Sequence, residues 1–525
     1  MRVYSTDRIG IIGVNGAGKT TLINILSEKL EPDEGWIKLY GRCSYISQLQ
    51  PPENKRISSE MASKFGVPEI WNENMSGGEK TRFKLAESFG NDSLLIFADE
   101  PTSNIDIDGI ELIESYFSEY RGGLVLISHD RSFLDKLCNK IWEIENGKLK
   151  VYNGNFSEYN AQKAKERERS QFEYDRFLEE KKRLEEAIVD KRQKVKSIKK
   201  APKRMGNSEA RLHKMGNQKA KASLERAIKN IEARIEHLDV KEKPLEEERI
   251  KFDLAESTKI HSKILIAGKN LYKEFGDKVI FRDAEFQIDN GAKVALIGPN
   301  GCGKSTLLKM IMAEDPSIKT APGAKIGYFS QDMSILDENL TILENVMEDS
   351  IYQETFARTL LARLLFKRED VFKQVNVLSG GERVKVSFAK ILLKNINLLM
   401  LDEPTNYLDI NSLEVIEEAL QNYNRTILFV SHDRSFISAI ADRIMLIENH
   451  QIKMFNGSYQ EYLTKRNQPT KNSLMDVEKH IFVLQNRLSE IIGRLSMPSK
   501  KDDLQALDQK YHQVLRELNR LKGQG

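Results

Sequence analysis

Long apolar runs are missing from this chain of 525 residues, and cysteine is scarce. No stretch approaches the roughly eighteen consecutive apolar residues of a membrane helix, and the first residues do not form an apolar signal segment. We therefore expect a cytoplasmic protein without a transport channel of its own. The three cysteines, Cys43, Cys138 and Cys302, lack the spacing of metal ligands, which argues against disulfide bonds and zinc sites.

An overall excess of one charge is also missing, because 81 Lys and Arg nearly balance 78 Asp and Glu. The exception is the segment 191–230, which holds 14 Lys or Arg and only two Glu. Any surface for nucleic acid must therefore be local, and this segment is where we expect it.

One set of motifs is present twice, at a constant offset of 303 residues. The repeated motifs are Ser-Gly-Gly-Glu (76–79 and 379–382), Asp-Glu-Pro-Thr (99–102 and 402–405) and Ser-His-Asp-Arg (128–131 and 431–434). Three motifs at one offset indicate a tandem duplication, and the chain is long enough for each half to bury a core of its own.

Each half contains a glycine-rich loop between a predicted strand and a predicted helix. Glycines let backbone N–H groups wrap around phosphates, the loop lysine reaches the outer phosphates, and the following hydroxyl binds Mg²⁺. The sequence therefore predicts two ATP sites. The loop residues assigned to ATP are Gly13, Asn15, Gly16, Gly18, Lys19, Thr20 and Thr21 in the first half, and Gly298, Asn300, Gly301, Gly303, Lys304, Ser305 and Thr306 in the second.

Two apolar runs, Leu94–Ala98 and Leu398–Leu401, are predicted as buried parallel strands that end in an acidic pair. The first acid of each pair, Asp99 or Asp402, is expected to hold Mg²⁺, through water or directly, together with the hydroxyl of Thr20 or Ser305. The second acid is expected to polarise the attacking water, because that carboxylate must lie near the γ-phosphate without joining the metal shell. These two predicted catalytic residues are Glu100 and Glu403.

His129 and His432 follow further apolar strands, within the repeated Ser-His-Asp-Arg motif. A single histidine at such a place is usually a hydrogen-bonded residue at a strand end. Because both halves have it in the same motif, we predict that a neutral imidazole contacts the γ-phosphate and helps to fix the water.

These residues together resemble an ATP-binding-cassette protein, in which two domains pair head to tail. The resemblance identifies Gln48 and Gln331 as Q-loop residues that contact ATP and metal. It implies two composite sites, each built from one half's loop, Glu and His and the other half's signature. The signatures assigned to ATP are Ser76, Gly77, Gly78 and Glu79, which would serve Lys304, and Ser379, Gly380, Gly381 and Glu382, which would serve Lys19. Closing would be driven by ATP and opening by hydrolysis.

The resemblance places Asp106 and Asp409 at the interface, but the two halves differ around them. Ser103-Asn104-Ile105 departs from Asn406-Tyr407-Leu408, so the two sites need not hydrolyse ATP equally.

The halves also differ in length. From Gln48 to Ser76 is 28 residues, against 48 from Gln331 to Ser379, so the helical part of the first half is shorter by 20.

The first half also has no counterpart of Ile264–Glu285. That segment includes Phe275, the residue expected to stack on adenine, or its alternative Tyr272. Either the chain as given starts within a longer protein, or the first half binds adenine by another route.

The segment 160–262 is predicted as two long helices with apolar seams, one from Phe177 to Ile198 and one from Leu224 to Leu238. Breaks are expected at Ala201–Asn207 and again at Met215–Asn217. Arms of about 35 residues would hold their tip roughly 50 Å from the base. A solvated linker needs no such seam, so we predict that the basic tip binds RNA phosphate. The predicted RNA-binding residues are Lys199, Lys200, Lys203, Arg204, Arg211 and Lys214.

The tail repeats this pattern around Met497-Pro498-Ser499, which predicts a second helical hairpin. It is expected either to contact the ribosome or to serve as a packing or dimerisation element.

Two cassettes joined by a basic helical hairpin resemble the ABC-F translation proteins, and within that family most closely the Vga-like antibiotic-resistance ribosome-protection proteins. The resemblance implies an α/β fold of two P-loop nucleotide-binding domains joined by an antiparallel helical hairpin. The domains are expected at 1–159, 160–262 (the linker), 263–466 and 467–525 (the C-terminal hairpin).

The resemblance also implies a function. A monomeric ATPase with ATP and Mg²⁺ as cofactors would bind large-subunit ribosomal RNA at the exit site and shift the peptidyl-site tRNA. It would thereby displace lincosamides, streptogramin A compounds and pleuromutilins. The alternatives are a housekeeping ABC-F factor that relieves stalled ribosomes, and a detached transporter ATPase, which would need a membrane partner.

Overall fold

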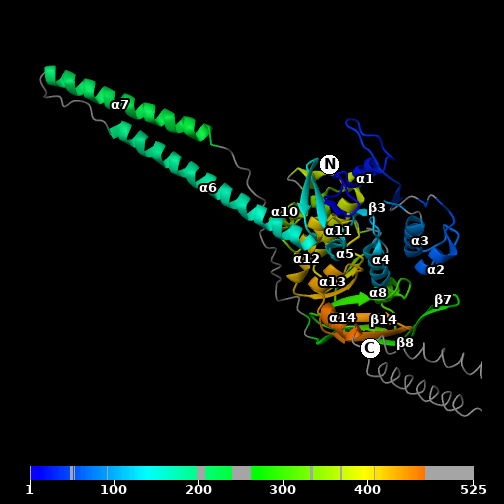
Figure 1. Ribbon diagram of the computed structural model, residues 1–525. Helices are drawn as coiled ribbons and strands as arrows, with labels where there is room; N and C mark the ends of the chain where they lie inside the picture. Colours follow the sequence, from blue (N-terminus) through cyan, green and yellow to red (C-terminus); the bar gives the residue numbers. More distant parts are fainter. Residues whose placement is uncertain are drawn as a thin grey trace, which may run out of the picture.

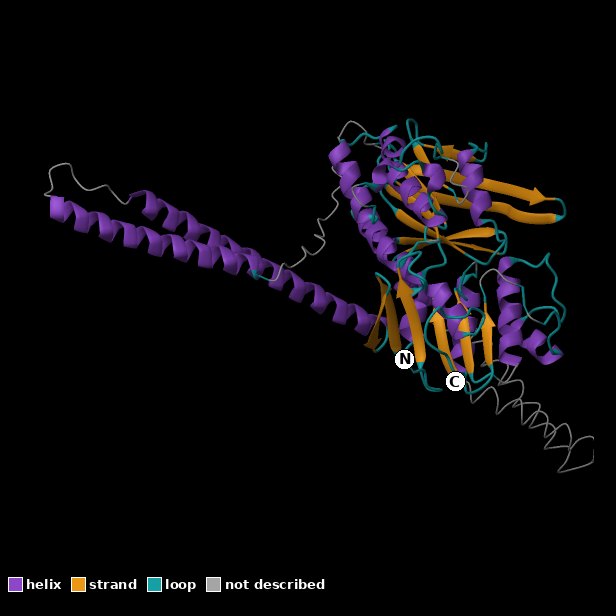
Figure 2. Ribbon diagram, turned by 90° about the horizontal axis from the view of Figure 1, so that it is seen from above, coloured by secondary structure: helices purple, strands orange, loops and turns teal. Residues whose placement is uncertain are grey.

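The computed structural model describes residues 2–47, 51–52, 54–90, 93–103, 105–197, 207–238, 260, 262–330, 335–366, 369–406 and 408–467. Two α/β cassettes lie against each other, and an arm of two long antiparallel helices projects from them (Figure 1, Figure 2). The mixed α/β fold of two cassettes joined by a helical linker, expected from the motifs, is confirmed.

The first cassette is built on a six-stranded sheet in the order β2-β3-β4-β1-β5-β6, parallel except for the edge pair β5 and β6. Its strands are β1 (Arg8–Gly13), β2 (Cys43–Ile46), β3 (Leu95–Asp99), β4 (Gly123–Ile127), β5 (Lys140–Glu145) and β6 (Lys148–Asn153). The central strands are almost wholly buried, as expected for a parallel sheet that helices cover on both faces.

The second cassette repeats this sheet in the order β11-β12-β13-β9-β14-β15 and adds a three-stranded antiparallel sheet, β10-β7-β8. The strands are β7 (Ile264–Phe275), β8 (Lys278–Asp289), β9 (Lys293–Ile297), β10 (Ile318–Thr320), β11 (Ile326–Phe329), β12 (Leu398–Asp402), β13 (Thr426–Val430), β14 (Arg443–Glu448) and β15 (Gln451–Asn456). The antiparallel sheet has no counterpart among the described residues of the first cassette, in line with the missing segment noted in the sequence.

The helices of the first cassette are α1 (Lys19–Leu26), α2 (Ser59–Phe65), α3 (Gly77–Gly90), α4 (Ile107–Glu119) and α5 (Arg131–Leu137). Those of the second are α8 (Lys304–Met312), α9 (Ile342–Met347), α10 (Glu354–Arg363), α11 (Gly380–Leu392), α12 (Ile410–Gln421), α13 (Arg434–Ile440) and α14 (Tyr459–Asn467), with 3-10 turns η2 (Asp370–Phe372) and η3 (Val375–Val377). Three helices and two turns of the second cassette thus stand where the first has α2 and α3, which accounts for the difference in motif spacing.

Both signatures fold as helix N-termini because their first and last residues form a capping box. The hydroxyl of Ser379 accepts the amide of Glu382 at 3.4 Å, while the Glu382 carboxylate accepts the Ser379 amide at 2.8 Å. Ser76 and Glu79 make the same pair of bonds, at 3.3 and 2.8 Å. The motif that the sequence assigns to ATP therefore also sets the start of α3 and of α11.

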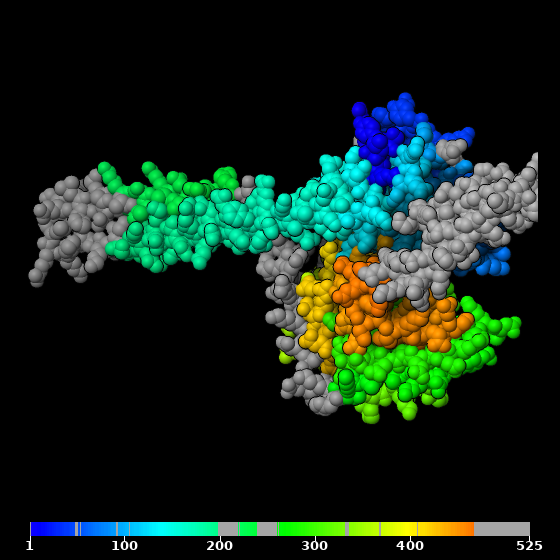
Figure 3. Space-filling model, turned by 60° about the horizontal axis from the view of Figure 1, so that its bottom comes forward, coloured from blue at the N-terminus to red at the C-terminus, as the bar shows by residue number. Residues whose placement is uncertain are grey.

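The arm consists of α6 (Phe156–Ser197) and α7 (Asn207–Glu236), and it stands clear of the cassettes over most of its length (Figure 3). The 42 residues of α6 span about 60 Å. Of the predicted seam residues, Leu184, Ile188 and Ile228 are buried, and the other described ones are half-buried.

The break predicted at Met215–Asn217 is wrong, because α7 runs through these residues without interruption. An interior glycine costs a helix only about 1 kcal/mol, which the neighbouring residues of a 30-residue helix outweigh. The break predicted at Ala201–Asn207 falls mostly outside the described residues; α6 ends before it and α7 begins at Asn207.

Each cassette contributes one isoleucine to the core of the other. Ile107, at the start of α4, is buried in the core of the second cassette, and Ile410, at the start of α12, is buried in the core of the first. Because each residue removes apolar surface from water only when the cassettes are together, the exchange favours their pairing.

Candidate nucleotide-binding and hydrolysis site

A continuous cavity of about 1850 Å³ lies between the two cassettes. It exceeds the roughly 300–1,000 Å³ of a typical single-ligand site, and both cassettes line it. The predicted site residues that line it are Asn15, Gly16, Gly18, Lys19, Thr20, Thr21, Asp99, Glu100, His129, Phe275, Asn300, Gly301, Gly303, Lys304, Ser305, Thr306, Ser379, Gly380, Gly381, Glu382, Asp402, Glu403 and His432. The fold thus brings residues more than 300 positions apart to one cavity.

The phosphate loops have the backbone that glycine permits. Gly18 and Gly303 precede α1 and α8 with φ of 95° and 111°, in the left-handed region. Lys19 Nζ donates to the carbonyl oxygen of Gly13 at 2.7 Å, and Lys304 Nζ donates to that of Gly298 at 2.8 Å. Each lysine therefore lies over its own loop, buried enough that its charge faces the cavity rather than bulk water.

A hydroxyl and a carboxylate lie side by side in each half, at the start of the loop helix and at the end of the central strand. Thr20 Oγ1 donates to Asp99 Oδ2 at 2.9 Å, and Ser305 Oγ donates to Asp402 Oδ1 at 3.2 Å. Burial raises the pKa of both carboxyl groups above the ordinary value. The hydroxyl and the carboxylate of each half are oxygen ligands of the kind that Mg²⁺ prefers.

No group of three or more potential ligands among His, Cys, Asp and Glu occurs in the described part of the chain. A cation held at either pair would take its remaining oxygens from the nucleotide or from water.

Glu100 and Glu403 are held in a strained conformation directly after their strands. Each has φ of 51°, uncommon for a residue with a side chain, and each amide donates to the neighbouring strand, to Ile127 O at 2.9 Å or Val430 O at 3.0 Å. Such strain is concentrated at functional sites. Burial, reinforced by neighbouring Asp99, raises the pKa of Glu100 to about 8. Burial likewise raises the pKa of Glu403 to about 7.

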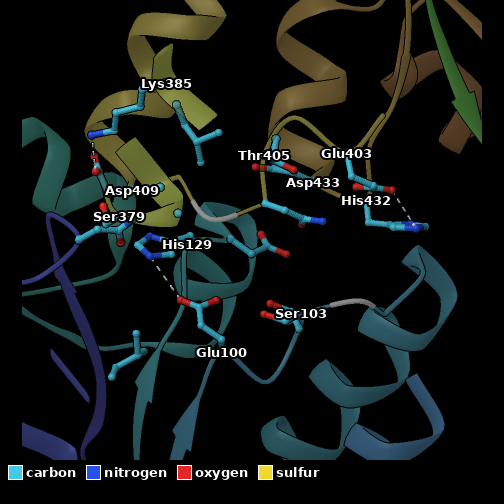
Figure 4. Close-up of a pocket in the computed structure, with 18 of the residues that line it drawn as sticks. Glu100, Ser103, His129, Ser379, Lys385, Glu403, Thr405, Asp409, His432 and Asp433 are labelled. Atoms are coloured by element: carbon cyan, nitrogen blue, oxygen red, sulfur yellow. Dashed lines mark hydrogen bonds and ion pairs between the residues drawn. The ribbon is translucent and has the colours of Figure 1, made fainter. Parts of the chain in front are cut away.

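Each glutamate faces the histidine of its own half (Figure 4). His129 Nε2 lies 3.5 Å from Glu100 Oε1, and His432 Nε2 lies 3.2 Å from Glu403 Oε1. Burial lowers the pKa of both imidazoles to about 3, with a nearby lysine acting in the same direction. Both rings are therefore neutral near pH 7, the form that the sequence analysis expected.

Asp106 and Asp409, the aspartates expected at the interface, cap α4 and α12. Asp106 Oδ2 also accepts the amide of Asn300 in the other cassette's phosphate loop, at 3.0 Å. Asp409 instead forms an ion pair with Lys385, at 3.1 Å. Burial alone would raise the pKa of Asp409, but Lys385 and hydrogen bonds outweigh it and lower the pKa. The two interface aspartates thus have different partners.

Lys385 lines the cavity and was missed in the sequence, although it lies six residues after Ser379, on the helix that the signature begins. The corresponding residue of the first half is Arg82. Comparing the two halves three residues beyond the motif would have shown a cation in both.

Some predicted residues are not brought to this cavity. The first signature, Ser76–Glu79, begins α3 and is not among the residues that line it. Phe275 lines the cavity with 57% of its surface exposed, whereas Tyr272 does not line it and donates to Glu274.

Several predicted positions lie outside the described residues. They are Gln48, Gln331, Asn104, Tyr407, Lys199, Lys200, Lys203, Arg204 and the tail beyond Asn467; Arg211 and Lys214 belong to the described backbone of α7, but their side chains are not described.

Known proteins share these features. Family models described as ABC transporter match residues 1–63 with 281–406, and residues 142–223. The erythromycin resistance ATP-binding protein MsrA of Staphylococcus epidermidis is 34% identical over 448 residues, which cover 84% of this chain and 92% of that protein. The ribosome protection protein VmlR of Bacillus subtilis (strain 168) is 32% identical over 543 residues, covering 99% and 94%. ABC transporter F family member 5 of Arabidopsis thaliana is 31% identical over 538 residues, covering 87% and 73%. The chain belongs to the ABC-F family.

This ABC-F protein is an ATPase, as its ATP-binding cassettes and its relatives indicate. The solved structure of an RNase-L inhibitor resembles it with a TM-score of 0.58 at 20% identity, over 88% of each chain, which shows the shared tandem-cassette fold. Among the described residues, no helix is both long and apolar enough to cross a membrane.

Proposed function

We propose that this ABC-F protein binds the ribosome and protects it from antibiotics through an ATP-dependent cycle of closing and opening. The observation that carries the proposal is the position of the arm, whose first turns are bonded to β5 of the first cassette and pack in the core that also holds Ile410 of the second. The names of two relatives, an erythromycin resistance protein and a ribosome protection protein, support it. We propose that the domains 1–159 and 263–466 hydrolyse ATP, that the linker 160–262 contacts the ribosome, and that the segment 467–525 has a supporting role.

The clamp at the base of the arm consists of side chains around Glu143 on β5. Tyr159 Oη and Tyr152 Oη donate to this carboxylate at 2.8 and 3.2 Å, and Lys163 Nζ forms an ion pair with it at 2.7 Å. Phe156 and Tyr159 are buried in the same core as Ile410 of the second cassette. Movement of the second cassette around ATP would therefore be passed to the base of α6 and magnified at the tip.

At each site, the lysine and loop amides would hold the phosphates, and Phe275 would stack on adenine in the second half. Thr20 with Asp99, and Ser305 with Asp402, are proposed to hold Mg²⁺, assisted by Gln48 and Gln331. That cation would neutralise charge on the phosphates.

Glu100 and Glu403 are the proposed bases, and the neutral His129 and His432 the residues that fix the water. Their raised pKa values suit this role, since a base that titrates near the working pH both accepts and releases a proton readily. The proposed sites are composite, with Ser379–Glu382 completing the first and Ser76–Glu79 the second once the cassettes close further.

The tip of the arm is the proposed RNA-binding element, through Lys199, Lys200, Lys203, Arg204, Arg211 and Lys214. From the exit site of the large subunit it would reach toward the peptidyl-transferase centre, shift the peptidyl-site tRNA and displace a drug. Lincosamides, streptogramin A compounds and pleuromutilins are the proposed classes. The ribosome places this activity in the cytoplasm.

The test is a panel of minimum inhibitory concentrations in a drug-sensitive host that expresses the protein. The panel includes the three proposed classes and erythromycin, and the control is the Lys19→Ala, Lys304→Ala variant, which keeps the arm but loses both loop lysines. We expect protection by the wild type alone.

ATP-dependent cosedimentation with ribosomes is measured beside the panel. Cosedimentation without protection from any class would refute the resistance role and leave a housekeeping ABC-F factor. Loss of cosedimentation would refute ribosome binding and leave a detached ATPase.

A further inference from the structure

Two arginine–glutamate pairs cross the interface between the cassettes, outside the residues assigned to catalysis. Arg131 of the first cassette binds Glu417 of the second, with Nη1 donating to Oε2 at 2.9 Å and Nη2 contacting the other oxygen. Arg434 of the second cassette binds Glu114 of the first in the same two-pronged manner, with Nη1 at 3.3 Å from Oε2. All four side chains are at most 14% exposed.

The two pairs are related by the internal duplication. Arg131 and Arg434 are equivalent at the offset of 303 residues, as are Glu114 and Glu417. Between the pairs, Ser132 Oγ lies 2.7 Å from Ser435 Oγ. A contact between equivalent residues has to lie on the two-fold axis that relates the halves. The pairs therefore flank that axis.

In each pair, the arginine lies two residues after a catalytic histidine, and the glutamate lies in the C-terminal half of a helix whose N-terminus is at the cavity. Arg131 follows His129 by two residues, and Glu417 lies on α12, whose N-cap is Asp409. The eight residues from Asp409 to Glu417 span about 12 Å of rigid helix. Asp409 itself returns to the cavity, where its charge acts on His129.

The other half has the same sequence of contacts, from histidine to arginine, glutamate and aspartate. Arg434 follows His432 by two residues and grips Glu114 on α4, whose N-cap is Asp106. Asp106 reaches the opposite phosphate loop at the amide of Asn300, and its charge acts on His432. In both halves the arginine thus closes a loop that begins at the histidine and ends at the aspartate of the opposite cassette.

We propose that Arg131 and Arg434 are positioning residues, which fix each catalytic histidine relative to the interface aspartate of the opposite cassette. The inference rests on the catalytic roles proposed above for His129 and His432. Adhesion alone does not account for these pairs, because a buried ion pair is often no more stabilising than apolar side chains of similar volume. A two-pronged arginine–carboxylate pair does fix direction as well as distance, which apolar contact does not.

The test separates adhesion from positioning by changing both pairs together. Arg131→Met with Arg434→Met leaves buried Glu417 without its partner and buried Glu114 with Lys136 alone, at 2.8 Å, so we expect a lower melting temperature and lower ATP turnover. Adding Glu417→Leu and Glu114→Leu replaces both pairs by apolar contacts. We expect this fourfold variant to recover most of the melting temperature of the wild type, short of it because Lys136 loses Glu114 and Asp130 loses Arg434. Its kcat should remain roughly ten- to hundredfold low, as for catalytic groups misplaced by about 1 Å, with the KM for ATP little changed.

A matched control lies one residue further along α12. Arg363 pairs with Glu418 at 2.6 Å within the second cassette, with similar burial of the arginine. Arg363→Met should lower the melting temperature and leave kcat as in the wild type. Recovery of kcat together with stability in the fourfold variant would overturn the proposal and leave the arginines a purely adhesive role.

A separate measurement tests the catalytic assignment on which the proposal rests. Wild-type kcat in His129→Ala with His432→Ala would overturn the assignment of the histidines, whatever the arginine variants do. A low kcat in that variant, with full recovery in the fourfold variant, would overturn only the positioning role.

Discussion

The base of the arm offers a direct test of how the cassettes and arm are joined. Lys163→Met removes the cation that lies 2.7 Å from Glu143, a carboxylate that is only 11% exposed. Loss of one partner from a buried ion pair costs about 3–5 kcal/mol. The hydroxyls of Tyr152 and Tyr159 still donate to Glu143, so we expect the lower end, about 3 kcal/mol. At roughly 2–4 °C per kcal/mol for a domain of this size, the melting temperature should fall by about 6–12 °C.

The assay is calorimetry of the nucleotide-free protein, with two companion variants. Lys150→Met breaks the exposed ion pair between Lys150 on β6 and Glu166, which lies on α6 as Lys163 does. This variant should change stability by less than about 1 kcal/mol. Glu143→Gln added to Lys163→Met removes the uncompensated charge and should restore most of the loss. A melting temperature for Lys163→Met equal to that of Lys150→Met, or no rescue by Glu143→Gln, would refute the argument that this clamp holds the arm.

Three further predictions concern catalysis, pH and salt. Glu100→Gln with Glu403→Gln should retain ATP binding and lose about two to four orders of magnitude in turnover; rapid turnover in a stopped-flow assay would sink the assignment of the bases. Burial raises the pKa of Glu100 to about 8, so the folded protein retains a proton there that the unfolded chain releases. The contribution of Glu100 to the free energy of unfolding therefore declines from about pH 5 to about pH 8. Nucleotide-free Glu100→Gln lacks this decline, and its melting temperature relative to the wild type should rise over that range; a constant difference would contradict the shift. Finally, replacing the basic tip residues by Ala should lower the salt slope of ribosome binding by about 0.7–0.9 per lost phosphate contact, and an unchanged slope would show a merely solvated surface. The residues to replace are Lys199, Lys200, Lys203 and Arg204.

Much of the fold follows from short-range features of the sequence. The strand–loop–helix context of Gly13 to Thr20 and of Gly298 to Ser305 appears as β1 with α1 and β9 with α8. The buried strand expected at Leu94–Ala98 is β3, shifted by one residue, because Leu94 is 60% exposed at its edge. Local periodicity also predicted the arm, but it placed a break at Gly216 that the cooperativity of a long helix overrides.

The sequence by itself determined the duplication, the two sets of motifs and the helical arm, since these depend on residue type and on spacing along the chain. Only the tertiary structure decided which residues face each other across the interface. The pairing of Arg131 with Glu417 and that of Asp106 with Asn300 depend on how two separately folded cassettes dock, whereas the pair of Lys385 with Asp409 depends on packing within the second cassette. Docking brings together groups 286 and 194 positions apart, and no local pattern encodes the distance between them.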